Sequence, residues 1–200
     1  MIPVSMILHL YPKGVFPMSI DGVIEWYGVR HRALFPIEGI RLSKSMQKRL
    51  RKADFEVTFD QAYSSVIEGC ADREDTWLSD ELMDCFNELH RIGIGHSCEV
   101  WMDGELVGGI YGLAFGAWFS AESMFHRRTD MSKIALHYMV QECRKQGFTI
   151  FDAQVMNPHL RSLGAFEVQL DAFLQLARHA KARATPWGEA AVEEYLSIED

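Results

Sequence analysis

The chain has 200 residues, of which 48% are hydrophobic and 24% charged, and its formal net charge is −8. These values are typical of one ordinary globular domain, with room for a small annex. The negative charge argues against indiscriminate binding of nucleic acid. No apolar run reaches the roughly 18 residues that a membrane span requires.

The start of the chain, MIPVSMILHLYPKGVF, has no basic n-region and no small-residue cleavage site, so we expect no signal peptide. The four cysteines, Cys70, Cys85, Cys98 and Cys143, are scattered and form no CxxC pair. We therefore expect a cytoplasmic protein with reduced core thiols, no bound metal and no membrane partner. We also expect a monomer.

The N-terminal part of the chain predicts a short helix over residues 5–13 that ends at Gly14. Residues 15–40 are rich in Gly and Pro and indicate a small, irregular annex. We place the end of this reduced N-terminal annex at residue 31, so that residues 32–200 form the main domain.

The segment RLSKSMQKRLRK, residues 41–52, contains basic residues and no acidic one. Ser43 is suited to cap a helix that runs to about Lys52. A basic segment on an acidic protein can mark a local contact with phosphate groups. Taken alone, the run favours a solvated helix face over a phosphate contact.

Two further helices are expected between this basic segment and the middle of the chain. The stretch TFDQ, residues 58–61, has the spacing of a capping box and predicts a helix that stops at Gly69. Ser79 predicts the start of another, which ends at Gly93. The apolar residues at helical spacing are Ala62, Tyr63, Val66 and Ile67 in the first helix, and Leu82, Phe86 and Leu89 in the second.

A run of strands follows. SCEVWM and ELVGGIYG are joined by Asp103-Gly104, which is a strong signal for a β-hairpin. AWFSAESMF predicts a third strand, residues 131–146 a helix that stops at Gly147, and FTIFDAQV a buried strand. DAFLQLARHAKARA predicts the last helix. This order indicates an α+β fold with one central, mostly antiparallel sheet and flanking helices.

Polar side chains lie at the ends of two of these expected strands. Strict alternation in FDAQ puts Asp152 and Gln154 on one face, where both could meet the same small group. A buried hydrogen-bonded pair that fixes the strand end is an equal alternative. In FSAESMF, Glu122 shares a face with Ser120 and Met124, and the alternative for Glu122 is a salt bridge to Lys133 or Arg128.

The hairpin, strand, helix and strand together resemble the acetyltransferase (GNAT-like) fold. Enzymes of this kind that use coenzyme A need a Gly-rich loop before the helix, where backbone N–H groups hold the pyrophosphate. Here that junction reads HRRTDMSK and contains no glycine. The fold is therefore expected to be GNAT-like, with an acyl donor other than coenzyme A.

An ordered set of motifs resembles the leucyl/phenylalanyl-tRNA–protein transferase family. The motifs are GVFPM, RLSKSM, VIEGC, DTW, GHSCEVW, ELVGGIYG, ESMF, the SK of DMSKIAL, DAQ and HLRSLGA. They run in the family's order from about residue 6 to about residue 174. A longer N-terminal segment with a GLLAxGGDL-like motif, found in many members, is not recognisable here, and Met18 stands where some members have Trp.

The resemblance implies a function. The family transfers Leu, Phe or Met from aminoacyl-tRNA to an N-terminal Lys or Arg of a protein, which marks that protein for degradation, and it uses no coenzyme A or other cofactor. A relative that binds tRNA or peptide without turnover, and a transferase that acts on N-terminal Asp or Glu, are the alternatives. A coenzyme A-dependent N-acyltransferase is a third, against which the glycine-free junction counts.

The resemblance also implies which residues form the site. Asp152 and Gln154 match positions at the reacting ester, and Glu122 matches a position that holds the aminoacyl-adenosine end. Trp77 matches an aromatic residue that stacks on the terminal adenine. The side-chain pocket is implied to consist of Ile110, Phe119, Met124, Leu136 and Phe151. The tRNA-contacting cluster is implied to consist of Lys44, Lys48, Arg49, Arg51 and Lys52.

Overall fold

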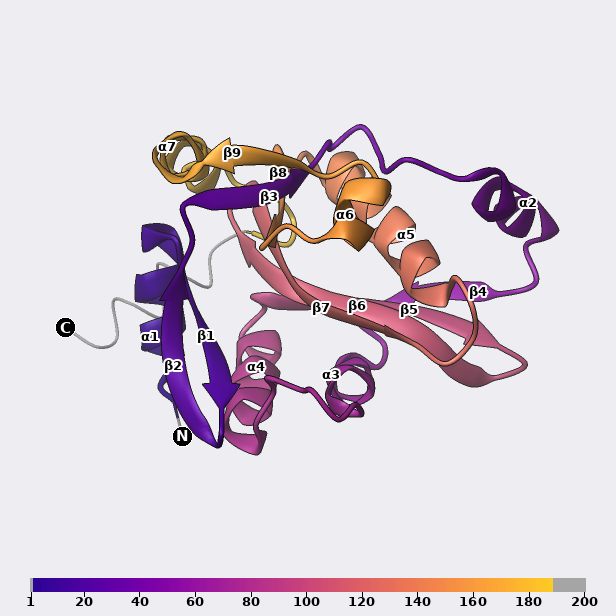
Figure 1. Cartoon of the computed structure of the whole chain (residues 1–200), viewed down its shortest axis with the longest axis horizontal. Coiled ribbons are helices and arrows are strands. Elements are labelled where there is room, and N and C mark those ends of the chain that lie inside the picture. The colour runs from indigo at the N-terminus through magenta and orange to yellow at the C-terminus, as the bar shows by residue number, and fades with distance from the viewer. Residues whose placement is uncertain (1, 189–200) are drawn as a thin grey trace.

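A seven-stranded sheet forms the centre of the computed structural model, which describes residues 2–188 (Figure 1). In the order in which they lie side by side, its strands are β4 (Glu56–Phe59), β5 (Gly95–Met102), β6 (Glu105–Phe115), β7 (Trp118–His126), β8 (Ile150–Gln154), β3 (His31–Phe35) and β9 (Phe166–Gln169). All neighbouring strands are antiparallel except β7 and β8, which are parallel.

Helices cover both faces of the sheet. The helices are α1 (Val4–Leu10), α2 (Lys44–Lys52), α3 (Tyr63–Ala71), α4 (Asp80–Arg91), α5 (Met131–Gln146), α6 (Pro158–Ser162) and α7 (Leu170–Lys181). Residues of α5, α6 and α2 form one core cluster with side chains of the sheet. Residues of α1, α3, α4 and α7 form the other, which includes the fully buried Trp118. This two-sided burial confirms the α+β class expected from the sequence.

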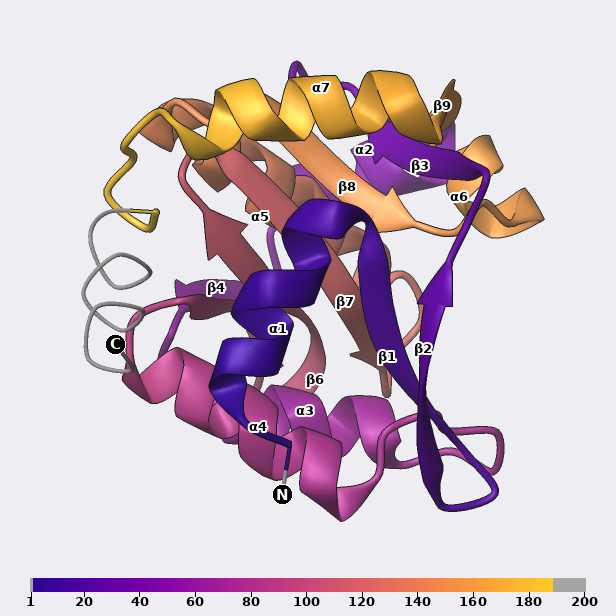
Figure 2. The same cartoon turned by 90° about the vertical axis from the view of Figure 1, so that its left-hand side faces the viewer.

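The N-terminal segment lies against one end of this body. α1 continues into a single 3-10 turn, η1 (Tyr11–Lys13), and then into a two-stranded hairpin of β1 (Val15–Ile20) and β2 (Val23–Gly28). Figure 2 shows this segment between α7 and α4. Its apolar residues belong to the same core cluster as α4 and α7, so the segment is packed into the main body.

Several predicted boundaries are confirmed. α5 begins and ends at the predicted residues, and Gly147 follows it with a positive φ of 89°. Ser43 and Ser79 cap α2 and α4, because their side chains accept the backbone N–H groups of Met46 and Leu82. The Asp103-Gly104 turn joins β5 to β6 as expected, with positive φ at both residues.

The prediction of an irregular segment over residues 15–40 was wrong. It contains β1 and β2, and β3 is an internal strand of the central sheet, paired with β8 on one side and β9 on the other. The short elements β4, α6 and β9 were also not predicted. All of these depend on partners that are distant in the sequence.

The predicted capping box at TFDQ was also wrong. Thr58 lies in β4, and helix α3 begins only at Tyr63 and ends at Ala71. The Thr58 hydroxyl donates to the buried carboxylate of Glu99 (2.6 Å) and accepts from the indole of Trp101 (2.8 Å). The Thr58 side chain is therefore used in contacts with β5 across the sheet and does not cap a helix.

The parallel pair of the sheet stops early. β7 and β8 pair only from Trp118 and Ile150 to Ser120 and Asp152, and α5 connects them. Beyond these residues β7 continues to His126 without β8 beside it. This layout, a hairpin and a strand followed by a helix and a parallel strand, is the GNAT-like arrangement expected from the sequence.

Candidate active site

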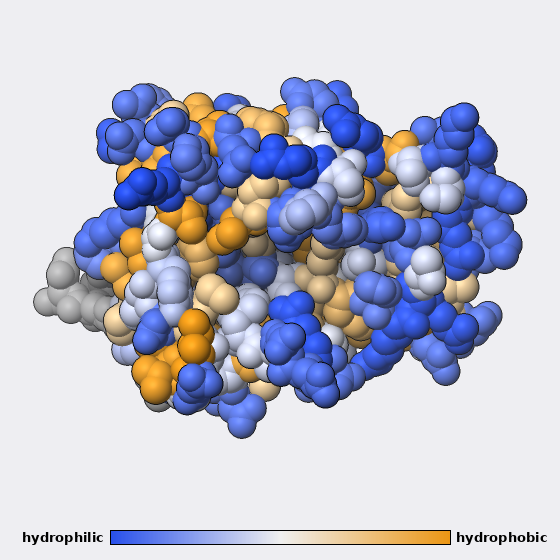
Figure 3. Space-filling model, in the orientation of Figure 1, coloured by the Kyte–Doolittle hydropathy of each residue, from blue (hydrophilic) through white to orange (hydrophobic). Residues whose placement is uncertain are grey.

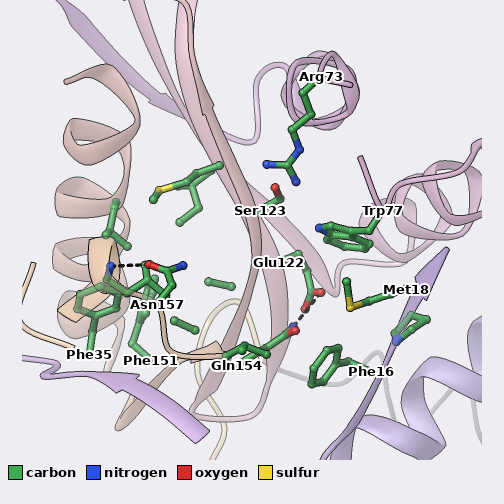
Figure 4. A pocket seen from close by; sticks show the side chains of 18 residues that line it. Phe16, Met18, Phe35, Arg73, Trp77, Glu122, Ser123, Phe151, Gln154 and Asn157 are labelled. Atoms are coloured by element: carbon green, nitrogen blue, oxygen red, sulfur yellow. Dashed lines mark hydrogen bonds between the residues drawn. The ribbon is translucent and has the colours of Figure 1, made fainter. Parts of the chain in front are cut away.

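A pocket of about 340 Å³ lies where β7 and β8 stop pairing. Figure 4 shows Glu122 and Gln154 in its middle, Phe35 and Phe151 on one side, and Trp77, Met18 and Phe16 on the other. The lining residues are Phe16, Pro17, Met18, Phe35, Arg73, Trp77, Ile110, Ala121, Glu122, Ser123, Met124, Leu136, Phe151, Ala153, Gln154, Val155, Asn157 and Leu160. Apolar side chains thus dominate both ends of the pocket, and Glu122 and Gln154 lie at its centre.

A β-bulge in β7 sets the position of Glu122. Tyr111 of β6 pairs with Ser123 and Gly112 pairs with Ala121, so Glu122 is the extra residue. A Cβ atom on Gly112 would lie 2.3 Å from the backbone oxygen of Ser120, so only glycine fits this close approach. The strict alternation expected for this strand was therefore wrong, and four successive residues from Ala121 to Met124 line the pocket.

Three groups donate hydrogen bonds to the Glu122 carboxylate. Tyr11 Oη and Gln154 Nε2 both contact Oε2 at 2.9 Å, and Ser120 Oγ contacts Oε1 at 3.1 Å. Desolvation raises the pKa of Glu122 to about 7, although these three hydrogen bonds lower it in part. Glu122 forms no salt bridge with a described residue; Lys133, a suggested partner, binds Asp130 instead.

The carboxamide of Gln154 has one end held and one end free. Its Nε2 donates to Glu122 Oε2 at 2.9 Å, the oxygen that also accepts from Tyr11, and it also reaches Ser120 Oγ at 3.4 Å. Its Oε1 accepts no hydrogen bond from any described residue, while the side chain lines the pocket. This oxygen is therefore available to accept a hydrogen bond from a bound substrate.

Asp152 lies behind the pocket. Its side chain is fully buried and is not among the lining residues. Arg32 Nε and Nη2 donate to its two oxygens, at 3.2 Å and 2.5 Å, and the backbone N–H of Gln154 donates to Oδ1 at 2.9 Å. The expectation that Asp152 and Gln154 meet the same small group was wrong, because Gln154 has a φ of 61° and leaves the alternation of the strand.

Four of the five residues expected to form the side-chain pocket lie together in its apolar end. Ile110, Met124, Leu136 and Phe151 line it. Phe119 is fully buried and does not line it, but packs on Phe151 with ring centroids 5.2 Å apart. The other apolar residues at this end, Phe35 and Leu160, come from segments that the sequence analysis did not assign to the site.

The opposite end of the pocket is its aromatic mouth. Trp77 precedes α4 and lies beside Met18 of β1 (Figure 4). The backbone N–H of Ser19 donates to the carbonyl of Trp77 at 3.0 Å, which ties the hairpin to this loop. Met18 therefore stays beside Trp77, where its thioether contributes a polarisable surface to the pocket.

The basic cluster lies on α2, at the right-hand end of the molecule in Figure 1. Figure 3 shows this end covered by hydrophilic residues. Lys44, Lys48 and Arg51 are exposed and form no ion pair with a described residue. Arg49 and Lys52 both pair with Asp54, at 3.3 Å and 2.7 Å, so their charges are partly compensated.

The residues that sequence reasoning missed come mostly from the N-terminal segment. Tyr11 and Phe16 belong to η1 and β1, and Arg32 lies at the start of β3. The motif GVFPM contains Phe16 and was noted only as a point of resemblance. A buried tyrosine hydroxyl and a buried guanidinium need partners, but nothing local indicates which carboxylates supply them.

The start of α5 differs from a pyrophosphate-binding helix start. Asp130 precedes the helix with a φ of 70°, and its carboxylate accepts a hydrogen bond from Lys133 at 2.7 Å. The junction before the helix contains no glycine, the residue that lets a pyrophosphate-binding loop bring its backbone N–H groups close to the anion. Among the described residues, no group of three or more His, Cys, Asp or Glu side chains could hold a metal ion.

The family profile and the curated relatives point to the same family. The profile of the leucyl/phenylalanyl-tRNA protein transferase family matches residues 34–178. The leucyl/phenylalanyl-tRNA–protein transferase of Ruegeria sp. (strain TM1040) is 44% identical over 172 residues, covering 84% of this chain and 82% of that relative. That of Cereibacter sphaeroides (strain ATCC 17029) is 41% identical over 189 residues, covering 92% and 88%. L-PGS from Bacillus licheniformis, a solved structure, is 11% identical with a TM-score of 0.45, covering 77% of this chain and 51% of L-PGS.

The sheet layout, with a pocket at the opening of its parallel pair and a carboxylate and a carboxamide at the pocket centre, defines a GNAT-like domain with a candidate active site. The family match covers most of the chain, and the two relatives are more than 40% identical over most of their own length. The chain belongs to the leucyl/phenylalanyl-tRNA–protein transferase family and is an aminoacyltransferase.

Proposed function

We propose that this protein transfers Leu, Phe or Met from aminoacyl-tRNA to the N-terminal Lys or Arg of acceptor proteins. It acts in the cytoplasm as a monomer, and its products enter the N-degron pathway of protein degradation. It needs neither coenzyme A nor a metal ion. The observation that carries this proposal is the free Oε1 of Gln154, held between the apolar end of the pocket and its aromatic mouth.

The donor binds along the pocket. The apolar end takes the side chain of the transferred amino acid, and the terminal adenine stacks at the mouth on Trp77, which contributes about 1–3 kcal/mol. The ester between the amino acid and the ribose then lies at the pocket centre, beside Glu122 and Gln154. Unbranched and γ-branched side chains fit this end better than β-branched ones, with moderate discrimination, since one methylene contributes about 1–3 kcal/mol.

The reaction is aminolysis of an ester. The acceptor's α-amine, with a pKa near 8, is partly neutral at pH 7. Its nitrogen attacks the ester carbonyl carbon, the bond to the ribose oxygen breaks, and the proton lost by the amine goes to that oxygen. Gln154 Oε1 accepts an N–H of the amine and orients it, and Glu122 holds the Gln154 carboxamide. The excess of acidic residues in the chain favours an acceptor that begins with Lys or Arg.

A transfer assay tests this function. Radiolabelled Leu-, Phe-, Met- and Val-tRNA are offered with peptides that begin with Lys, Arg, Asp, Glu or Ala. We expect label on the Lys and Arg peptides from the first three donors, and much less from Val-tRNA. Label only on Asp or Glu peptides contradicts the acceptor assignment. Acetyl-coenzyme A as donor serves as the negative control.

The exposed basic residues of α2 are expected to contact tRNA phosphates. The variant Lys44→Gln/Lys48→Gln/Arg51→Gln should weaken tRNA binding and make the slope of log K against log salt less steep by about 2–3, since each lost phosphate contact contributes about 0.9. Filter binding at several salt concentrations measures this slope. A matched variant, Arg178→Gln/Lys181→Gln/Arg183→Gln, removes the same charge around the end of α7. An equal effect of both variants contradicts a local contact at α2.

A further inference from the structure

We propose that Arg32 is a positioning residue for aminoacyl transfer, which holds the carboxamide of Gln154 in its working orientation through Asp152. This inference rests on the proposed function, in which Gln154 orients the attacking amine. It concerns a residue of β3 that does not line the pocket and that no motif in the sequence indicated.

The chain of contacts from Arg32 to the pocket is continuous. Arg32 is 1% exposed, and its guanidinium donates hydrogen bonds to both oxygens of the fully buried Asp152 carboxylate. Asp152 Oδ1 also accepts the backbone N–H of Gln154, at 2.9 Å. Gln154 Nε2 then donates to Glu122 at the centre of the pocket. Four groups from β3, β8 and β7 are thus connected in series.

The carboxylate of Asp152 stabilises an unfavourable backbone conformation. Gln154 has a φ of 61°, which a residue with a side chain rarely adopts without local support. The hydrogen bond from its N–H to Asp152 supplies that support. If this bond is lost, the backbone can return to an extended conformation, and the carboxamide turns away from Glu122.

Arg32 is itself held by two further segments of the chain, the N-terminal segment and α7. Its guanidinium lies 5.2 Å from the ring centroid of Phe16 and 4.7 Å from that of Phe173, and Nη1 donates to the carbonyl of Gly14 at 3.2 Å. A lysine could not make two parallel bonds to Asp152 and also stack between two rings. Arg32 therefore connects the N-terminal segment and α7 to Asp152, and through Asp152 to Gln154 in the pocket.

Stability alone does not account for this arrangement. A buried ion pair often contributes no more to stability than apolar residues of the same volume. Here the Arg32–Asp152 pair also binds the backbone N–H of Gln154, a pocket residue with a positive φ. A pair that only stabilised the fold would not need this contact. A positioning role predicts an effect on kcat and on the environment of Gln154, separate from any effect on folding.

The test compares Arg32→Lys with Leu89→Ala, which weakens packing on α4, a helix that supplies no lining residue. Phe173→Leu, which removes one of the two stacked rings, is measured as a second variant if Arg32→Lys folds poorly. For Arg32→Lys we expect a 10- to 100-fold lower kcat, with the Kd for aminoacyl-tRNA changed less than twofold. For Phe173→Leu we expect a smaller loss in the same direction, and for Leu89→Ala an unchanged kcat in the folded fraction.

A second readout is independent of activity. The side-chain NH₂ resonances of Gln154, assigned by their absence in Gln154→Met, should shift in Arg32→Lys and Phe173→Leu but not in Leu89→Ala. Unshifted resonances, or a loss of kcat that Leu89→Ala reproduces, overturn the positioning role. If the unaltered protein transfers nothing to any acceptor, the proposed function fails, and the resonances still decide whether Arg32 controls Gln154.

Discussion

The substitution Gln154→Met should lower kcat for transfer by about 10²–10³-fold, with little change in the Kd for aminoacyl-tRNA. Methionine has a similar length and can occupy the same place, but it offers the amine only a weakly accepting sulfur instead of the Oε1 oxygen. In the proposed function Gln154 orients the incoming amine, so its loss should affect the reaction more than the binding of the donor. Single-turnover transfer from labelled Phe-tRNA to an Arg-initiated peptide measures kcat, and filter binding measures Kd.

Asn157→Ser is the matched control for this prediction. Asn157 also lines the pocket, but its Oδ1 is used to cap α6 by accepting the N–H of Leu160 at 2.9 Å. Serine preserves such a cap and removes the carboxamide. Transfer should therefore stay within a few-fold of the unaltered protein. If Gln154→Met raises Kd and leaves kcat unchanged, Gln154 binds the donor and does not orient the amine.

The parts of the fold that were predicted correctly have strong local signals. The Asp103-Gly104 turn and the glycine after α5 both fix positive φ angles, and both were found. Asp21-Gly22 is the same hairpin signal, with φ of 51° and 78°, but Pro17 in the preceding strand favoured an irregular segment. The structure tolerates this proline because β1 pairs only with β2. β3 has no comparable signal, since both of its partners, β8 and β9, lie more than 100 residues away in the sequence.

The candidate site, too, has a part that could be predicted from local sequence and a part that could not. Glu122 and Gln154 could be found because polar residues at the ends of buried strands need a partner or a use. Their partners could not be found, because Tyr11 and Arg32 are separated from Glu122 and Asp152 by 111 and 120 positions. The bulge at Glu122 and the positive φ of Gln154 also break the alternation on which the prediction relied. Local spacing thus identified the polar groups, and tertiary contacts decide which of them face the pocket.

The second large effect is expected from Glu122→Gln, as a change in how stability depends on pH. The pKa of Glu122 is raised from 4.5 to about 7 in the folded protein, chiefly by desolvation and in addition by the charge of Asp152. Between these two values the folded protein holds a proton that the unfolded chain has released. Stability therefore falls as pH rises from about 4.5 to about 7, and is constant above that.

Glutamine can replace this carboxylate without leaving a donor or acceptor unpaired. Its Oε1 can take the place of the oxygen that accepts from Tyr11 and Gln154, and its NH₂ can donate to Ser120 Oγ, whose hydroxyl rotates freely. We expect the variant to match the unaltered protein at pH 5 and to exceed it by roughly 1–3 kcal/mol at pH 8, since one pKa unit corresponds to about 1.4 kcal/mol and Glu122 is only half-buried. Urea unfolding at pH 5, 6, 7 and 8 measures the difference.

Glu68→Gln, on the exposed surface of α3, is the control, and its difference from the unaltered protein should not rise between pH 5 and 8. A flat difference for Glu122→Gln as well would mean that Glu122 is already ionised at pH 5 in the folded protein. In that case its carboxylate is stabilised by Tyr11, Ser120 and Gln154 more strongly than desolvation opposes it. The rise with pH therefore decides whether Glu122 at the centre of the pocket is neutral or charged near pH 7.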